Sequence, residues 1–272
     1  MGLRVNTNVA SLTAQRNLAA VTGRLQGNYA RLSSGLRIAT ASDDAAGLGI
    51  SERMRSQIRS YAVAGRNAQD GVSLTQTAEG SLQEVSNNLT RMRELAVQAA
   101  NGTLTTTDRA TIDAEFQELV AEIDRVAGDA SFNGLNLLDG STASIDLQVG
   151  TDAGDTITVN MVDATAATLG VDALDVTSAA NASAALTAID TAIDSVSTGR
   201  GTLGAAQNRL NSAIASIANT RENLSAAESR IRDVDVAAET ADLTRNTILQ
   251  QAAVSVLAQA NVQPQLALNL LG

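Results

Sequence analysis

A heptad pattern between Leu203 and Ala241 restricts the fold of this chain more than any other feature of its sequence. Large apolar residues recur at every seventh position, and mostly small residues stand three positions after each of them. The large residues are Leu203, Leu210, Ile217, Leu224 and Ile231, and the small positions hold Ala206, Ala213, Thr220, Ala227 and Val234. This a/d pattern is typical of a coiled-coil helix, and its small residues let a partner helix come close. The helix therefore needs a partner.

The helical pattern continues beyond Val234, and no Gly or Pro follows until Pro264. It predicts one helix from Leu203 to Ala258, about 80 Å long at 1.5 Å per residue, and Gln263-Pro264 is expected to end it. A pattern of this length indicates an elongated coiled coil or bundle. Residues 250–258 are apolar on nearly all sides. Such a segment is expected to be buried in an assembly, or to stay unfolded until assembly.

Composition excludes several classes of catalytic protein. The chain has no Cys and no His, which removes the usual zinc sites and His-based acid–base chemistry. All 19 basic residues are Arg, so Lys catalysis is excluded as well. Hydrophobic residues make up 44% of the 272 residues but aromatic residues only 1%, so a core must consist of Leu, Ile, Val and Ala. We expect neither an enzyme nor a cofactor.

The net charge of −10 is unevenly distributed along the chain. Nine Arg against three acidic residues give residues 1–66 a charge of +6, and ten Arg against 26 acidic residues give the remainder −16. The acidic bulk disfavours nucleic acid as a partner, while the basic segment is suited to acidic surfaces of other copies. No apolar run has the length of a membrane span, and the N-terminus lacks the core of a cleaved secretory signal.

The N-terminal third is predicted to be helical with two interruptions. Residues 5–38 have the spacing of an amphipathic helix, which Ser33-Ser34-Gly35 is expected to break. The Gly-containing loop 41–50 includes Asp43 and Asp44. The pair allows metal binding or acid–base chemistry, but helix capping is the favoured interpretation. A short Arg-rich helix is predicted from Ser51 to Asn67.

Two further heptad segments predict a helical hairpin. Ala78 to Ala99 and Ile112 to Val126 alternate steps of four and three between apolar residues. Asn101-Gly102 is expected to end the first helix as a left-handed cap, and Asp108 to cap the second. The seam of this hairpin is suited to accept the long C-terminal helix.

The middle of the chain predicts a β-hairpin followed by a loop. Residues 145–149 and 157–161 alternate apolar and polar residues around a turn-forming stretch, and residues 163–178 are expected to form a surface loop. Helix is predicted to resume near Ala182. The segment Gly199-Arg200-Gly201-Thr202-Leu203-Gly204 matches G-x-G-x-x-G, but helical periodicity precedes it. A turn between helices is therefore favoured over a dinucleotide-binding loop.

Long motifs at both ends of the chain resemble bacterial flagellin, the subunit of the flagellar filament. They are Asn6-Thr7-Asn8-Val9-Ala10-Ser11-Leu12, Arg31-Leu32-Ser33-Ser34-Gly35-Leu36-Arg37-Ile38, Ala41-Ser42-Asp43-Asp44-Ala45-Ala46-Gly47-Leu48, Arg93-Glu94-Leu95-Ala96-Val97-Gln98, Phe132-Asn133-Gly134-Leu135-Asn136-Leu137-Leu138, Leu203-Gly204-Ala205-Ala206-Gln207-Asn208-Arg209-Leu210 and Glu222-Asn223-Leu224-Ser225-Ala226-Ala227-Glu228-Ser229-Arg230-Ile231-Arg232-Asp233. The similarity covers nearly everything outside about 140–185.

The resemblance implies a mainly α fold: an elongated antiparallel helical bundle or coiled coil from both chain ends, with a small β-hairpin region at about 140–180. It implies that residues 1–40 and 235–272 form an inner coiled-coil domain and residues 41–234 an outer helical rod, without the large outer domains of many family members. The residues expected to pack between subunits at the ends are Leu18, Leu25, Leu32, Ile248, Ala252, Val256 and Leu270.

The resemblance also implies partners and a location. The chain is expected to form a homopolymer in the extracellular flagellar filament, after passing the flagellar export machinery with an export chaperone and a filament cap. In flagellins recognised by an animal Toll-like receptor, an Arg, a Leu and a Glu contact the receptor; Arg91, Leu95 and Glu115 match them here. These three residues are open to a second interpretation as subunit contacts only.

Two other structural classes remain as alternatives. A hook–filament junction protein of the same superfamily shares the general pattern, although the rod motifs favour flagellin. A signalling coiled coil explains the heptads but not the β-hairpin or the apolar ends.

Overall fold

The computed structural model describes residues 7–269, with side chains as far as Val262. Its elements in order are α1 (Val9–Ser34), α2 (Ala45–Ala99), α3 (Thr106–Asp129), β1 (Ser131–Phe132), β2 (Leu135–Asn136), β3 (Ser144–Gln148), β4 (Thr156–Asn160), α4 (Ala166–Leu169), α5 (Ala179–Arg232) and α6 (Val236–Asn269). The predicted mainly helical fold with a small antiparallel hairpin is confirmed. The chain divides into two compact units, Met1–Ser56 with Asn223–Gly272 and Gln57–Glu222, called unit 1 and unit 2 below.

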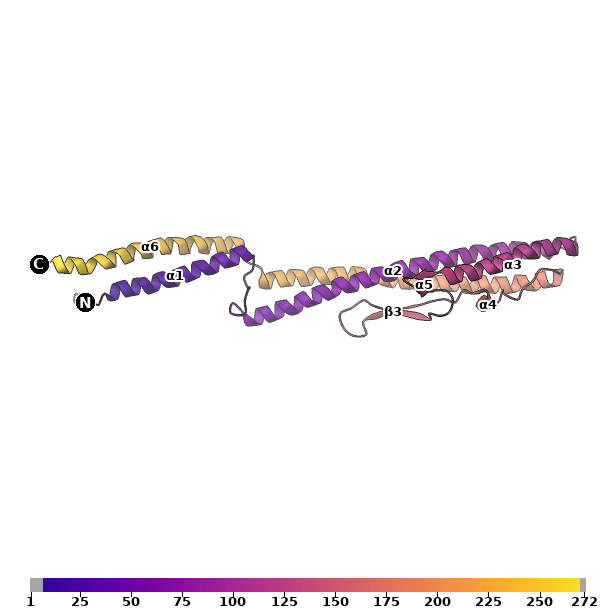
Figure 1. Cartoon of the computed structure of the whole chain (residues 1–272), viewed down its shortest axis with the longest axis horizontal. Coiled ribbons are helices and arrows are strands. Elements are labelled where there is room, and N and C mark those ends of the chain that lie inside the picture. Colours follow the sequence, from indigo (N-terminus) through magenta and orange to yellow (C-terminus); the bar gives the residue numbers. More distant parts are fainter. Residues whose placement is uncertain (1–6, 270–272) are drawn as a thin grey trace. The chain divides into compact units, whose positions relative to one another are not determined.

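Unit 2 is a bundle in which α3 and α5 run beside α2 (Figure 1). Apolar heptad residues of α2 and α3 meet α5 residues as far as Leu210 in one continuous core, whereas Leu224 and Ile231 of the α5 heptad lie outside it. Its largest fully buried side chains include Leu82, Leu89, Met92, Phe116, Ile123, Ile189, Leu203 and Leu210. The core therefore joins the hairpin of α2 and α3 to the start of the predicted heptad segment, through Leu203, Ala206 and Leu210, and not to the whole of it.

The turn between α2 and α3 is fixed by polar contacts. Thr105, and not Asp108 as expected, is the N-cap of α3: its hydroxyl accepts the Asp108 N–H, and the Asp108 carboxylate accepts the Thr105 N–H in return. The buried Arg109 side chain donates to the carbonyls of Ala99 at 2.8 Å and Asn101 at 2.9 Å. Since α2 ends at Ala99, these bonds satisfy carbonyls at its C-terminus.

The predicted β-hairpin is confirmed as β3 and β4, which pair antiparallel with Leu147 opposite Ile157. Ile157 and Val159 are buried in the core of unit 2, so one face of the hairpin packs on the bundle. Gly71 of α2 lies directly beneath Leu147, where an added Cβ would overlap a Leu147 methyl group.

The interpretation of residues 163–178 as a surface loop is wrong. The segment contains the single helical turn α4 and buries Leu169, Val171 and Val176 in the core. Two carboxylates of α3 hold its backbone: Asp124 accepts the Ala166 N–H and Asp113 accepts the Val176 N–H. The apolar residues are too widely spaced to show a helical or strand period, so the sequence pattern did not reveal their burial.

Two segments expected to be separate are parts of long helices. The Arg-rich stretch 51–67 belongs to the same helix as 78–99, because α2 is continuous over both. The G-x-G-x-x-G segment lies inside α5, so the predicted turn is also wrong. Gly199 is buried, and an added Cβ there would lie 2.7 Å from a methyl carbon of Val162. Close packing explains this helical glycine.

The single helix predicted from Leu203 to Ala258 is interrupted, because α5 ends at Arg232 and α6 begins at Val236. Gly35, at φ 71°, ends α1 as the sequence predicted, and its carbonyl accepts the Val234 N–H at 3.0 Å. The Arg232 carbonyl accepts N–H groups from the segment after Gly35. The Asp235 carboxylate then accepts the first N–H groups of α6. These hydrogen bonds satisfy the backbone groups at the ends of α5 and α6, so the helix can be interrupted although the apolar spacing continues.

In unit 1, α1 and α6 lie side by side as an antiparallel pair (Figure 1). Helix α6 continues through Pro264 to Asn269, so the expected end at Gln263-Pro264 is wrong. Proline has no N–H, which leaves the Ala260 carbonyl without its usual helical partner. The Asn8 side-chain amide donates to that carbonyl at 2.7 Å. An outside donor thus replaces the lost helical bond.

Candidate assembly surface

The α1–α6 pair leaves a large part of its apolar surface uncovered. Ile248 is 60% exposed and Val256 is 59% exposed. Other exposed apolar side chains of the pair are Val9, Leu12, Tyr29, Val236, Leu249, Val254 and Val262. Isolated apolar residues on a surface are common, but this many on two adjacent helices mark an interaction surface.

The residues expected to pack between subunits fall into two groups. Leu25 is buried in this chain, and Leu18 and Leu32 are half-buried. Ile248, Ala252 and Val256 are exposed, and Leu270 lies outside the described residues. The leucines of α1 thus pack largely within the chain, while the α6 residues are free to meet another molecule. Their role between subunits remains a prediction.

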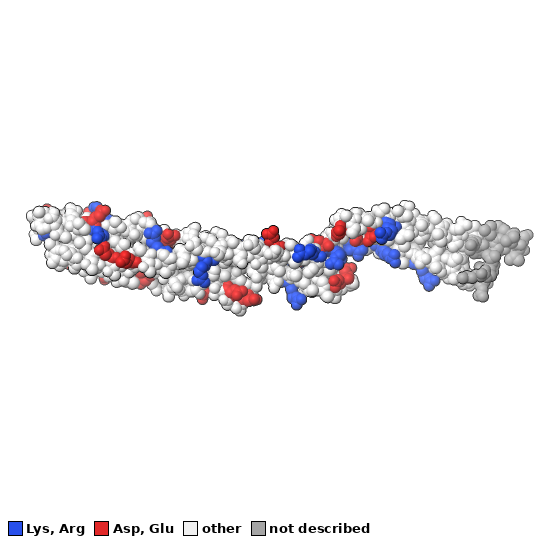
Figure 2. All heavy atoms as spheres, turned by 180° about the vertical axis from the view of Figure 1, so that it is seen from behind, with Lys and Arg blue, Asp and Glu red and all other residues white. Residues whose placement is uncertain are grey.

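The exposed part of α6 carries no formal charge. No Asp, Glu or Arg occurs between Asn246 and Val262. In Figure 2 the part of the helix pair next to the grey ends is mostly white, with only sparse charged groups. An apolar cavity of about 390 Å³ lies there between the two helices, lined by Val9, Ala10, Thr13, Ala14, Asn17 and Val256. An apolar partner suits this surface.

Polar contacts, which the sequence pattern did not single out, cross the α1–α6 seam at two levels. At one end Ser11 Oγ donates to Asn261 Oδ1 at 2.7 Å, beside the Asn8 contact with Ala260. Nearer the other end, Asn28, Arg31, Glu239 and Asn246 form a connected network. A search for apolar residues at heptad spacing does not detect these polar residues, although they lie between apolar positions of the same helices.

The three residues proposed to contact a receptor do not form one exposed group. Arg91 Nη2 and Glu115 Oε1 are 2.7 Å apart on the surface of unit 2, and Glu94 also accepts from Arg91. These bonds raise the pKa of Arg91, with the bond to Glu115 contributing most. Leu95, however, is only 2% exposed and belongs to the core. The contact of all three residues with a receptor stays a prediction, and Leu95 is the one whose side chain is buried in this chain.

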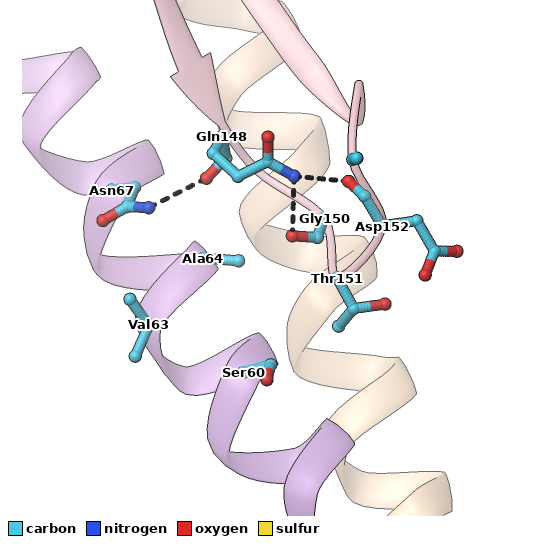
Figure 3. Close-up of a pocket in the computed structure, with 9 residues that line it drawn as sticks. Ser60, Val63, Ala64, Asn67, Gln148, Gly150, Thr151 and Asp152 are labelled. Carbon is cyan, nitrogen blue, oxygen red and sulfur yellow. Dashed lines mark hydrogen bonds between the residues drawn. The ribbon is translucent and has the colours of Figure 1, made fainter.

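A second groove lies beside the tip of the β-hairpin. It has a volume of about 400 Å³ and is lined on one side by Ser60, Val63, Ala64 and Asn67 of α2 (Figure 3). The Asn67 side-chain amide donates to the Gln148 carbonyl at 3.0 Å, and the Gln148 amide donates in turn to the carbonyls of Gly150 and Asp152. These bonds hold the hairpin tip against α2. The groove combines backbone carbonyls and small side chains, without a cluster of reactive groups.

The aspartates considered for chemistry have structural roles. The Asp43 carboxylate accepts the N–H groups of Ala39 and Thr40, which lowers its pKa, with the Thr40 backbone bond first among the causes. Asp44 accepts the Gly47 N–H at the start of α2. Both therefore cap turns, as favoured from the sequence. Over residues 7–269, no three or more Asp or Glu residues are grouped to hold a metal ion.

None of the helices in the described part of the chain is both long and apolar enough to span a membrane.

Comparisons with known proteins agree along nearly the whole chain. The bacterial flagellin N-terminal helical region matches residues 5–143, and the bacterial flagellin C-terminal helical region matches residues 186–271. A flagellin of Halalkalibacterium halodurans is 49% identical over 98% of this chain and 99% of its own length. A flagellar filament 30.7 kDa core protein of Treponema maltophilum is 43% identical, with the same coverage of each chain.

A solved structure supports the fold as well. The crystal structure of Bacillus cereus flagellin is 38% identical, covers 56% of this chain and 88% of its own, and superposes with a TM-score of 0.52. The family matches at both ends agree with a relative that matches over 98% of this chain. With these similarities, the chain belongs to the bacterial flagellin family.

Proposed function

We propose that this protein is the structural subunit of a bacterial flagellar filament and assembles with identical copies into a hollow helical fibre that drives swimming. The observation that supports this most directly is the exposed, uncharged apolar surface of α6 around Ile248 and Val256. Similar chains are named flagellins and filament core proteins. In this role the protein is not an enzyme.

The terminal helices gain stability when neighbouring subunits cover their apolar surface. Ordering a helix costs conformational entropy, which burial of apolar surface must offset. The α1–α6 pair buries few large side chains of its own, chiefly Leu25, while Ile248 and Val256 stay in solvent. When one face of a subunit binds a different face of the next copy, each subunit is rotated relative to the one before it. If these rotations do not return to the first subunit, the result is an open helical assembly rather than a closed ring. Such contacts complete the burial and build a filament at once.

We extend the proposal to domains, location and partners. Residues 1–40 and 235–272 would form the inner domain and residues 41–234 the outer domain of each subunit. The filament is extracellular, and the subunit reaches it through the flagellar export machinery with an export chaperone and a filament cap. The acid-poor N-terminal segment and the apolar ends suit a chain that is exported before it folds fully.

A point test of assembly uses the exposed α6 residues. Ile248→Asp with Val256→Asp places two charges where we propose that another copy packs, so filaments should no longer form. Ile248→Leu with Val256→Leu keeps the surface apolar and should still polymerise. Electron microscopy after salt-induced polymerisation is the readout, and circular dichroism checks that helix content is retained. Filaments of the double Asp variant at the wild-type yield would refute the proposal.

A deletion tests the same surface more coarsely. Removal of residues 250–272 should abolish polymerisation while unit 2 stays folded, because none of the described core residues of unit 2 comes from that segment. Filaments formed by the truncated chain would contradict the proposed role of α6.

A junction protein of the same superfamily is distinguished by abundance. The flagellin matches at both ends favour the filament subunit. In isolated filaments the main subunit should be the dominant protein, whereas a junction protein should be scarce. Quantitative mass spectrometry of purified filaments measures this ratio.

Receptor recognition is a narrower proposal that depends on Arg91 and Glu115. Their exposed ion pair presents a bidentate polar group on the surface of unit 2, while Leu95 supports α2 from inside. Purified monomer should activate reporter cells that express the receptor, and Arg91→Ala should weaken the response. Absence of any response to the wild-type monomer would remove the proposal and leave Arg91 with a structural role.

A further inference from the structure

Apolar contacts alone do not fix how α6 sits on α1. Helix α6 carries apolar or small residues around its whole circumference, as the sequence Ala252-Ala253-Val254-Ser255-Val256-Leu257-Ala258 illustrates. A helix is normally oriented by a distinct apolar face, and α6 does not have one. A slip by one helical turn would exchange one small or apolar residue for another. The observed pairing therefore needs another source of specificity.

A buried polar network supplies contacts that only one pairing satisfies. Asn246 Nδ2 donates to Asn28 Oδ1 at 2.9 Å, and Asn28 Nδ2 donates to Glu239 Oε1 at 2.5 Å. Arg31 Nε donates to the same carboxylate oxygen at 2.9 Å. Asn28 is 2% exposed and Asn246 9%, so neither can turn to water instead. Buried polar groups must find partners, which makes this network sensitive to register.

The contacts at the other end of the pair agree with the same alignment. Asn8 reaches Ala260 and Ser11 reaches Asn261, in the antiparallel register that also joins Asn28 to Asn246. A slip of α6 by one turn that brings Leu257 to the position of Asn261 would place Asp242 at the position of Asn246, and Asp235, which precedes α6, at that of Glu239. The Asn28 side-chain carbonyl would then face a carboxylate instead of an amide donor, and Asn28 and Arg31 would lose Glu239 as their shared acceptor.

We propose that Asn28, Arg31, Glu239 and Asn246, called the polar key below, select the register and rotation of α6 on α1. A single buried Asn at the seam of a coiled coil can fix register at a cost in stability, and this network extends that effect over four residues. The key thereby decides which apolar residues of α6 remain uncovered, with Ile248 and Val256 on the outer side. It rests on the proposed function in one respect: the uncovered side is the one offered to other copies.

The test uses cysteine pairs, which have no background because the chain contains no Cys. Ser11→Cys with Asn261→Cys reports the observed register, since these side chains are in contact. Ser11→Cys with Leu257→Cys reports a slip of one turn. Disulfide formation within one chain under a mild oxidant such as diamide is followed on non-reducing gels, before and after salt-induced polymerisation. With the key intact, the cysteine pair at 11 and 261 (the 261 pair) should form its disulfide at least about tenfold faster than the pair at 11 and 257 (the 257 pair). This factor follows because the slipped register leaves at least one buried polar group without a hydrogen-bond partner.

Removal of the key should erase that preference. Asn28→Leu with Asn246→Leu replaces both amides by apolar side chains of similar size, and the two cysteine pairs should then close at comparable rates while helix content is retained. Gln15→Leu with Gln251→Leu replaces two side-chain amides by Leu at exposed positions of the same helices, outside the key and the cavity, and should keep the wild-type preference. Glu239→Gln retains an acceptor and should also keep it, whereas Glu239→Leu should not.

Two results would overturn the proposal. One is a wild-type preference for the 261 pair when Asn28→Leu and Asn246→Leu are both present; the other is loss of both disulfides together with loss of helix, which would mean that the key provides stability rather than register. The proposed filament function is judged separately. If wild-type protein forms no filaments but closes only the 261 pair, the key stands and the filament proposal fails.

Discussion

Replacement of Arg109 by Met should destabilise unit 2 strongly, although the side chain takes no part in the apolar core. Its guanidinium donates to the carbonyls of Ala99 and Asn101 at the C-terminus of α2, and the residue is 9% exposed. Methionine keeps the length of the side chain but donates no hydrogen bond. Two carbonyls at a helix end would then lack these donors.

The magnitude follows from the two bonds. A hydrogen bond to a charged group contributes about 1.5–3 kcal/mol, and a cation near a helix C-terminus adds about 0.3–1 kcal/mol. Because Arg109 is slightly exposed, water can hydrogen-bond to the freed carbonyls and recover part of this stabilisation. We expect a loss of about 2–4 kcal/mol in the free energy of unfolding of unit 2.

Arg91→Met is the matched control, since the Arg91 side chain also donates to two residues but lies on the surface. Its pairs with Glu94 and Glu115 are half exposed, and exposed pairs contribute about 0–1 kcal/mol. Urea denaturation followed by circular dichroism gives both values. If the two variants lose the same stability, burial is not what makes the Arg109 contacts important, and the reasoning fails.

Two further predictions concern a helical glycine and a carboxylate. Gly199→Ala should destabilise unit 2 by about 1–3 kcal/mol, because the new methyl group meets the stiff Val162 side chain. Gly201→Ala is the control: its methyl group meets no described atom within 4 Å, and it should stabilise α5 by up to about 1 kcal/mol. Thermal unfolding measures both variants, and equal effects would contradict the packing explanation. The bond from Arg232 to Glu52 lowers the pKa of Glu52 below its ordinary value, so its stabilising contribution is complete above that ordinary value and is lost as the pH falls through the lowered pKa. The protection factors for hydrogen exchange at the start of α2, which correct for the intrinsic pH dependence of exchange, should therefore fall on acidification in the wild type and less so in Glu52→Gln; identical pH profiles would exclude this role.

The sequence alone determined the helical class of this protein and its main partners within the bundle. Heptad spacing at Leu82, Leu89, Phe116 and Leu203 predicted a shared core, and these side chains are buried. Alternation in residues 145–161 predicted the hairpin. Heptad spacing and alternation are informative because the residues on the buried face of a helix or strand recur with the period of that element. The pattern can therefore be recognised in the sequence alone.

Helix boundaries were predicted less well, because they depend on hydrogen-bond partners from distant segments. The apolar spacing runs without change through Asp233, yet the helix is interrupted there, because Gly35 and the residues after it supply hydrogen-bond partners for the backbone. Conversely, Pro264 carries a strong stop signal, yet α6 continues because Asn8 donates to the carbonyl that proline leaves free. In both places a residue more than 190 positions away decides the outcome.

The candidate assembly surface divides in the same way. The sequence indicated that residues 250–258 are too apolar for a solvated helix, and the structure leaves Val256 exposed. Only the tertiary structure separated Leu25, which packs within the chain, from Ile248, which does not, and brought Asn28 to Asn246. The physical reason is that composition and periodicity set how much surface must be buried, whereas the pairing of helices far apart in sequence sets which side chains meet and which remain in solvent.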